Sequence, residues 1–252
     1  MRLFGLLLSI FILSAVCLAE ETEYLDWKGS QLYAEKNYTG ALPYFEQAIS
    51  QDSNYTSAWV NRGNTQKALK DYNGSIQSYS KALELESNNS AAWSGLVDAY
   101  IALKDDEKAS QAIVRAKELN PTNKGLWLKA GNLLMTKGDY QGAVTEYDGA
   151  LAIDSQYKDA LYKKGVSLMA LAKSTEATEL FDQVLAQDPN YKLALNAKGL
   201  SLEAAGKYAD ALTAYDAALK IDPEFSQALN NKMHALLALK KGTEAMQIFA
   251  KL

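Results

Sequence analysis

Histidine, the side chain best suited to acid–base and metal chemistry near neutral pH, is scarce in this sequence. His234 is the sole histidine, which excludes a histidine-based metal cluster and leaves almost no general base near neutral pH. The acidic pair Asp105–Asp106 falls in an expected turn between helices, where solvated charge is ordinary. Gly125 and Gly142 are isolated and form no phosphate-binding loop. The sequence therefore predicts a protein that is not an enzyme and has no cofactor and no metal.

Four N-x-Ser/Thr motifs are the clearest modification signals. Their asparagines all lie in the first ninety residues, each at an expected turn: Asn37, Asn54, Asn73 and Asn88. Turns favour Asn, Ser and Thr for conformational reasons, so turn chemistry alone is one interpretation. In an exported chain the same motifs are acceptors for N-glycosylation, which is the other.

Residues 1–19 differ from the rest of the chain. Arg2 precedes an uncharged apolar run at residues 3–19, a pattern typical of a secretory signal peptide, with Cys17 and Ala19 at the small-residue positions of the cleavage site. We therefore expect an extracytoplasmic protein, either secreted or part of the cell envelope. The alternative is a retained membrane anchor, because the run reaches the short end of the roughly 17 to 25 residues that span a bilayer. A lipoprotein that uses Cys17 ranks last.

Charge and cysteine usage exclude other classes. The net charge is −4, and no basic run is longer than the pairs Lys163–Lys164 and Lys240–Lys241, so a nucleic-acid partner is not expected. Membrane contact is expected only through an uncleaved leader. The single cysteine lies in that leader, so residues 20–252 can form no disulfide.

A repeat of 34 residues organises residues 20–252. One repeat position holds small residues, a second holds large apolar residues, and a third holds glycine in five of seven copies. The small set is Ala41, Ser75, Ala109, Ala143, Ala177, Ala211 and Ala245; the large set is Phe45, Tyr79, Ile113, Tyr147, Phe181, Tyr215 and Phe249; the glycines are Gly29, Gly63, Gly131, Gly165 and Gly199. The pattern of each copy predicts two amphipathic helices joined by a turn. Such a hairpin can bury its apolar faces only against neighbouring copies.

These positions resemble the tetratricopeptide repeat (TPR) family, whose pattern places Trp, Leu, Gly, Tyr, Ala, an aromatic residue and Pro at these spacings. The resemblance implies an all-α fold, a right-handed superhelical solenoid of about seven 34-residue helix-turn-helix repeats. They begin near residues 22, 56, 90, 124, 158, 192 and 226. It is specific for fold and not for function, because a solenoid acts through the surface that it presents.

The resemblance also implies that the first helix of each repeat lines a concave groove in which peptides bind. Carried over, the groove positions are polar in the early repeats and largely apolar later, with amides that can hold a peptide backbone. They are Asn61, Asn64, Leu128, Asn132, Met135, Tyr162, Val166, Met169, Leu193, Asn196 and Leu200. The lysine of the carboxylate clamp that some relatives use is missing from its position, so a receptor for chain termini of that type is not expected.

The resulting prediction is a non-catalytic scaffold or assembly factor, exported from the cytoplasm, that binds a protein or peptide partner in the groove. The alternative is a structural cell-envelope glycoprotein or an accessory subunit of an envelope complex. Because nothing after Leu252 covers Met246 and Phe249, we also expect the last repeat to fray or to self-associate.

Overall fold

The computed structural model describes the backbone of residues 2–249 and the side chains of residues 18–249. Within residues 2–249 it forms fourteen α-helices and no strand, arranged as consecutive helix-turn-helix pairs. The all-α fold of about seven repeats is therefore confirmed. We call the first helix of each pair the A helix and the second the B helix. The leader expected at residues 1–19 lies outside the described side chains, apart from Leu18 and Ala19.

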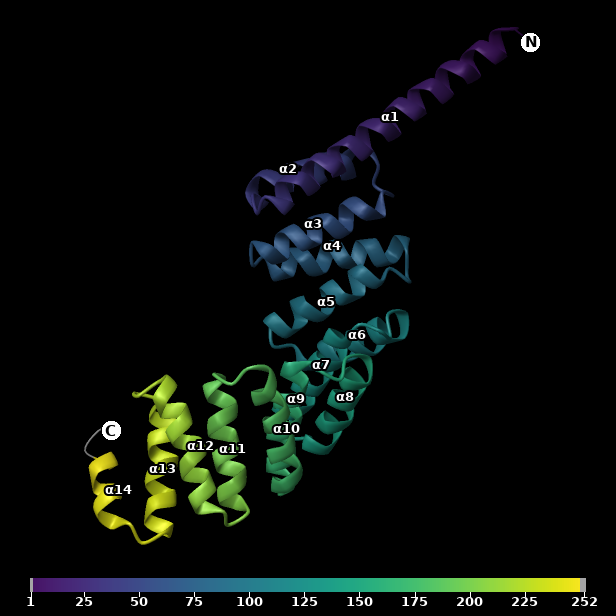
Figure 1. Ribbon diagram of the computed structural model, residues 1–252. Helices are drawn as coiled ribbons and strands as arrows, with labels where there is room; N and C mark the ends of the chain where they lie inside the picture. Colours follow the sequence, from purple (N-terminus) through teal and green to yellow (C-terminus); the bar gives the residue numbers. More distant parts are fainter. Residues whose placement is uncertain (1, 250–252) are drawn as a thin grey trace. The chain divides into compact units, whose positions relative to one another are not determined.

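The chain divides into two compact units, residues 1–121 and residues 122–252, which we call the N-terminal and the C-terminal unit (Figure 1). The helices of the N-terminal unit are α1 (Arg2–Ala34), α2 (Tyr38–Gln51), α3 (Thr56–Ala68), α4 (Tyr72–Leu85), α5 (Ser90–Ala102) and α6 (Asp106–Leu119). Those of the C-terminal unit are α7 (Lys124–Thr136), α8 (Tyr140–Ile153), α9 (Lys158–Ala170), α10 (Ser174–Gln187), α11 (Lys192–Ala204), α12 (Tyr208–Ile221), α13 (Ser226–Ala238) and α14 (Gly242–Phe249).

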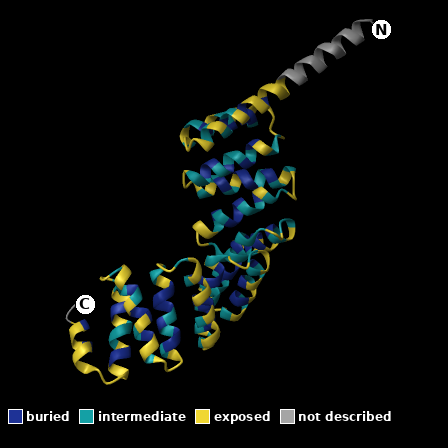
Figure 2. Ribbon diagram, in the orientation of Figure 1, coloured by how far each residue is buried: buried dark blue, intermediate teal, exposed yellow. Residues whose placement is uncertain are grey.

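In five of the seven repeats the core is built where an aromatic ring of the B helix meets a glycine of the A helix. Phe181 is fully buried, and a Cβ atom added to Gly165 would lie 2.7 Å from its Cε1 atom. Only a residue without a side chain allows the two helices to approach this closely. The same contact recurs in both units, and Figure 2 shows the buried stripe along successive helices. In the last repeat the equivalent ring, Phe249, is 66% exposed.

The turn between the two helices of a repeat requires a left-handed residue. Gly138 and Gly206 fill this position with φ of +80° and +75°, which glycine adopts without strain. The other five turns place a residue with a side chain in the same conformation: Lys36, Lys70, Lys104, Ala172 and Lys240, with φ between 58° and 64°.

Within the part of the chain that the structure describes, no helix carries an apolar stretch long enough to cross a membrane.

Candidate functional site

The predicted groove asparagines Asn64 and Asn132 each accept a hydrogen bond from a buried tyrosine of their own repeat. The Tyr79 hydroxyl donates a hydrogen bond to Asn64 Oδ1 at 2.7 Å, and the Tyr147 hydroxyl donates to Asn132 Oδ1 at 2.9 Å. Burial raises the pKa of Tyr79 and of Tyr147 well above the ordinary range. These amides therefore satisfy hydroxyl groups that would otherwise be buried without a partner. Their contact with a peptide stays a prediction.

The other two asparagines, Asn61 and Asn196, connect the A helices of neighbouring repeats. Asn61 Nδ2 donates to Asp26 Oδ1 at 2.9 Å, and Asn231 Nδ2 donates to Asn196 Oδ1 at 2.9 Å. Asn196 is only 7% exposed, so little of it is presented to a partner. This role was not predicted from the sequence, although the two partners of each bond are 35 residues apart, which is one repeat and one residue.

The apolar groove candidates of the C-terminal unit are half-buried, except Leu193, which is exposed at 37%. Tyr162 packs with its ring centroid 5.9 Å from Phe181 and 5.4 Å from Tyr191, and burial raises its pKa. Val166 and Met169 pack against the same hydrophobic cluster as Tyr162. Structure thus brings these three together on α9.

The remaining apolar candidates lie on other A helices. Leu200, on α11, packs against the cluster around Leu202 and Tyr215. On α7, Leu128 and Met135 are half-buried, and the Tyr147 hydroxyl lies 3.9 Å from Met135 Sδ. Each of these side chains keeps part of its surface exposed. Asn61 and Asn64 belong to α3, in the N-terminal unit.

The four sequon asparagines are all exposed, as a glycan acceptor must be. Asn37 caps α2, where its Oδ1 accepts a hydrogen bond from the backbone N–H of Gly40 at 3.1 Å. Asn88 Oδ1 accepts a hydrogen bond from Arg115 Nη2 at 2.8 Å. The expected turn position of Asn73 is wrong, because this residue lies inside the first turn of α4 and its sequon serine, Ser75, is fully buried.

Asp105 and His234 were the residues first considered for acid–base chemistry, and they lie at a helix end and on an exposed helix surface. Asp105 caps α6: its Oδ1 accepts a hydrogen bond from the backbone N–H of Lys108 at 3.1 Å, and its Oδ2 lies 3.0 Å from Lys108 Nζ. The backbone hydrogen bond, followed by the one from the Lys108 ammonium, lowers the pKa of Asp105. His234 is exposed on α13. Among the side chains that the structure describes, no group of three His, Cys, Asp or Glu residues could hold a metal ion.

A recurring contact that was not predicted from the sequence joins the start of an A helix to the connection that follows the B helix of the same repeat in the C-terminal unit. Lys158 Nζ lies 2.9 Å from Asp188 Oδ2 and 5.2 Å from the centroid of the Tyr191 ring. We call each such set of a lysine, an aspartate and an aromatic ring a clasp. Two further clasps occur 34 residues away in either direction: Lys124, Asp154 and Tyr157, and Lys192, Asp222 and Phe225. The recurrence of Lys, Asp and an aromatic residue at the repeat period was the available signal.

Comparison with sequence models of the tetratricopeptide repeat gives matches over residues 28–89, 66–131, 131–171, 159–191 and 196–252. These matches account for all of residues 28–252 except 192–195. The chain belongs to the tetratricopeptide repeat family. No curated protein matches the sequence.

Solved TPR structures share the fold. YrrB is 23% identical, with a TM-score of 0.69 over 75% of this chain and 97% of its own. MamA is 22% identical, with a TM-score of 0.63 over 68% of this chain and 94% of its own. A TPR protein from Parabacteroides merdae is 16% identical, with a TM-score of 0.69 over 92% of each chain. At these identities the likeness concerns the fold alone.

Proposed function

We propose that this TPR protein is a non-catalytic scaffold that binds a partner peptide against the A helices of its C-terminal unit. The observation that carries the proposal is the row of half-buried apolar side chains on α9 and α11, with Leu193 as its most exposed member. An apolar surface of this kind gains roughly 25 cal/mol for each Å² of its area that a partner covers. YrrB is described as having an unusual peptide-binding site, which supports the same use of this fold.

Site-specific photocrosslinking in native cells tests the proposal. A benzophenone amino acid replaces Leu193 on α11, and a control protein carries it at the exposed Thr213 on α12, outside the A helices. We expect a discrete crosslinked species from position 193 and none from position 213, and we expect Leu193→Lys to abolish partner binding while the thermal unfolding midpoint stays unchanged. Equal crosslinking from both positions would contradict the proposal. Tyr162 is unsuitable for this test, because its ring packs against Phe181 and Tyr191.

We further propose that the protein acts outside the cytoplasm, with residues 1–19 removed as a signal peptide. This rests on the charge and hydropathy pattern of the leader. N-terminal sequencing of native protein should find Glu20 first. A chain that starts at Met1 in a carbonate-resistant membrane fraction would instead support an anchor at residues 3–19.

The second candidate is a structural envelope glycoprotein, and the exposure of Asn37, Asn54, Asn73 and Asn88 favours it. The intact mass of native protein tests it. We expect a mass above that of residues 20–252, with Asn54 and Asn88 modified first. A mass equal to that sequence excludes glycosylation and with it this candidate.

Self-association through the last repeat is a further component of the proposed function. A cavity of about 230 Å³ there is lined by Met233, Leu237, Gly242, Ala245, Met246 and Phe249. Phe249 and Met246 are 66% and 71% exposed, whereas rings at the position of Phe249 are buried in earlier repeats. Light scattering should detect dimers that Phe249→Glu removes. A strictly monomeric protein at all concentrations would exclude this contact.

A further inference from the structure

Two cavities occupy the same position in different repeats. The first, which we call the α5 cavity, has a volume of about 530 Å³ and is lined by Ser80, Leu83, Glu84, Trp93, Leu96, Tyr100, Lys108, Gln111 and Ala112 of α4, α5 and α6. The second, the α11 cavity, has a volume of about 430 Å³ and is lined by Thr178, Asp182, Leu195, Lys198, Leu202, Asp210, Thr213, Ala214 and Ala217 of α10, α11 and α12. In each case an A helix lies between two B helices.

The two cavities correspond residue by residue. Most lining residues of one have an equivalent 102 residues away, three repeats along the chain. The pairs are Ser80 and Asp182, Trp93 and Leu195, Leu96 and Lys198, Tyr100 and Leu202, Lys108 and Asp210, Gln111 and Thr213, and Ala112 and Ala214. The α11 cavity is therefore an internal control for the chemistry of the α5 cavity.

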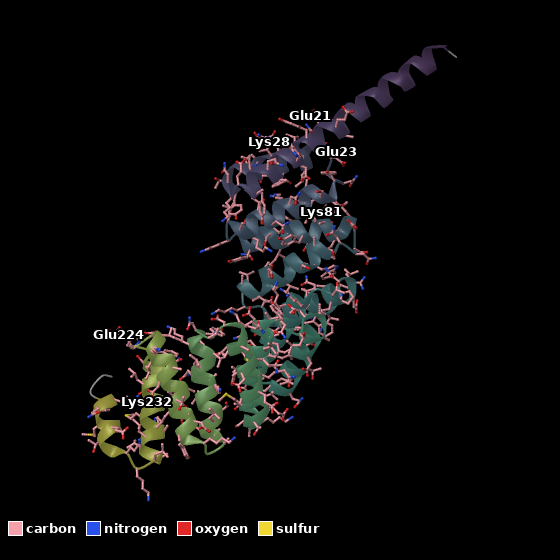
Figure 3. The ribbon with its side chains drawn as sticks, in the orientation of Figure 1. Glu21, Glu23, Lys28, Lys81, Glu224 and Lys232 are labelled. Carbon is pink, nitrogen blue, oxygen red and sulfur yellow. The ribbon has the colours of Figure 1, made fainter. Side chains whose placement is uncertain are left out.

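An ion pair crosses the α11 cavity and is absent from the α5 cavity. Lys198 Nζ lies 2.6 Å from Asp182 Oδ1. The same two repeat positions form the ion pairs Arg62–Glu46, Lys164–Asp148 and Lys232–Asp216, of which Lys232 is labelled on α13 in Figure 3. In the α5 cavity these positions hold Leu96, which is 4% exposed, and Ser80. The substitution replaces a charged wall with an apolar one.

Two aromatic rings replace two leucines in the same cavity. Trp93 Nε1 donates a hydrogen bond to the Ser87 carbonyl oxygen at 2.9 Å, which fixes the indole. Tyr100 follows Trp93 by seven residues, about two turns of α5. Lys108 Nζ lies 5.7 Å from the centroid of the Tyr100 ring. Aromatic rings attract a further ring in stacked or edge-to-face contact more strongly than aliphatic side chains do.

The charged residues at the edge of the α5 cavity are balanced within the chain. Lys108 Nζ lies 3.0 Å from Asp105 Oδ2, and Glu84 Oε2 lies 2.7 Å from Nζ of Lys81, which is labelled on α4 in Figure 3. Neither lining charge therefore calls for an ion of opposite sign. This charge balance is complementary to an uncharged ligand.

We propose that the α5 cavity binds an uncharged aromatic side chain of a protein partner, phenylalanine or tryptophan in type. Its volume lies within the roughly 300 to 1,000 Å³ of small-ligand sites, its wall is apolar at Leu96, and its rings are supplied by Trp93 and Tyr100. It is formed by α4, α5 and α6 of the N-terminal unit and is distinct from the A-helix surface of the C-terminal unit proposed above. Failure of one proposal would therefore leave the other unaffected.

Nuclear magnetic resonance titration of the full chain tests this proposal with N-acetyl-L-phenylalaninamide as the probe. We expect saturable shifts of the Trp93 indole N–H and of the backbone amides of α6. N-acetyl-L-leucinamide should bind about tenfold more weakly, in keeping with the contribution of ring–ring contacts. Trp93→Leu with Tyr100→Leu installs the side chains of the α11 cavity and should weaken probe binding by about tenfold or more, measured on the α6 amides.

A second pair of variants is matched to the ion pair. Ser80→Asp with Leu96→Lys recreates the pair that the same framework already holds at Asp182 and Lys198, and should abolish binding. Asp182→Ser with Lys198→Leu is the control and should leave it unchanged. The proposal is overturned if the leucine-bearing double variant binds as tightly as the wild type, or if the two probes bind equally. It is also overturned if the shifts spread over both units.

Discussion

The N-terminal and C-terminal units bury the same repeat positions but stabilise their helix ends by different chemistry. In the N-terminal unit every B helix begins with a side-chain cap: Asn37, Asp71 and Asp105 each accept a hydrogen bond from a backbone N–H of the first turn. In the C-terminal unit α8 has such a cap at Asp139, whereas Lys173 and Lys207 precede α10 and α12 without one.

The C-terminal unit has the clasps instead. The three lysines Lys124, Lys158 and Lys192 each contact the connection after the B helix of their own repeat. The equivalent residues of the N-terminal unit are Thr22, Thr56 and Ser90. Positions buried in every repeat are constrained by packing, whereas positions at helix ends allow several solutions of similar energy. The repeats therefore share the residue types of their cores and differ in the residues that stabilise their helix ends.

The largest expected effect tests whether the two cores are equivalent. Phe45→Ala and Phe181→Ala should each destabilise the protein by about 3 to 5 kcal/mol, because each removes a buried ring that lies against a glycine. Chemical denaturation monitored by circular dichroism measures both. Phe249→Ala, at the same position but exposed, is the matched control and should cost far less. A large inequality between the first two variants would show that the cores differ as well as the connections.

The second prediction concerns the caps. Asp71→Ala should cost about 1 kcal/mol, because it removes the acceptor for the Gly74 N–H. Lys207→Ala should remove no capping stabilisation, since the Lys207 side chain makes no cap hydrogen bond. Lys207→Asp should stabilise the protein by a similar amount. Thermal unfolding of the three variants decides the matter, and the idea of different helix ends fails if Asp71→Ala and Lys207→Ala behave alike.

The third prediction concerns the left-handed turns. All three described turns within repeats of the N-terminal unit use lysine, whereas the C-terminal unit uses glycine at two of its four. Lys104→Gly and Ala172→Gly should each raise stability by about 0.5 to 1 kcal/mol through relief of strain, partly offset by a more flexible unfolded chain. Gly206→Ala is the reverse control and should lower stability. No gain from either glycine would mean that neighbouring contacts compensate for the left-handed conformation.

Much of the fold could be predicted from the sequence, because the small, large and glycine positions recur at one period of 34 residues, as in a helix-turn-helix repeat. The division into two compact units was not predicted. The groove was harder, since its candidates were chosen by position on the A helix alone. Position does not reveal that Asn132 pairs with Tyr147 or that Asn196 pairs with Asn231. Those pairings depend on side-chain geometry between helices, which one repeat pattern does not encode.

The smallest expected effect concerns the clasps and depends on pH. The hydrogen bond from Lys158 lowers the pKa of Asp188 below its ordinary value, and the bond to Asp188 raises the pKa of Lys158. Because the pKa of Asp188 is lower in the folded chain, its contribution is present above the unfolded value of about 3.9 and is lost as the pH falls through the folded value. The contribution of Lys158 is present below about 10.4 and is lost as the pH rises through its raised folded value. The clasp is therefore complete between these limits.

Lys158→Met should consequently lower the unfolding midpoint slightly at pH 7, and the difference should vanish once the pH falls below the lowered folded pKa of Asp188. Both groups of the pair are partly exposed, so added salt should shrink the difference at pH 7 as well. Thr56→Met, at the same repeat position in the N-terminal unit, is the control and should show no such pH dependence. If the Lys158→Met difference did not shrink as the pH fell, contact of the side chain with the Tyr191 ring would be the source of the stabilisation, and the ion pair would not.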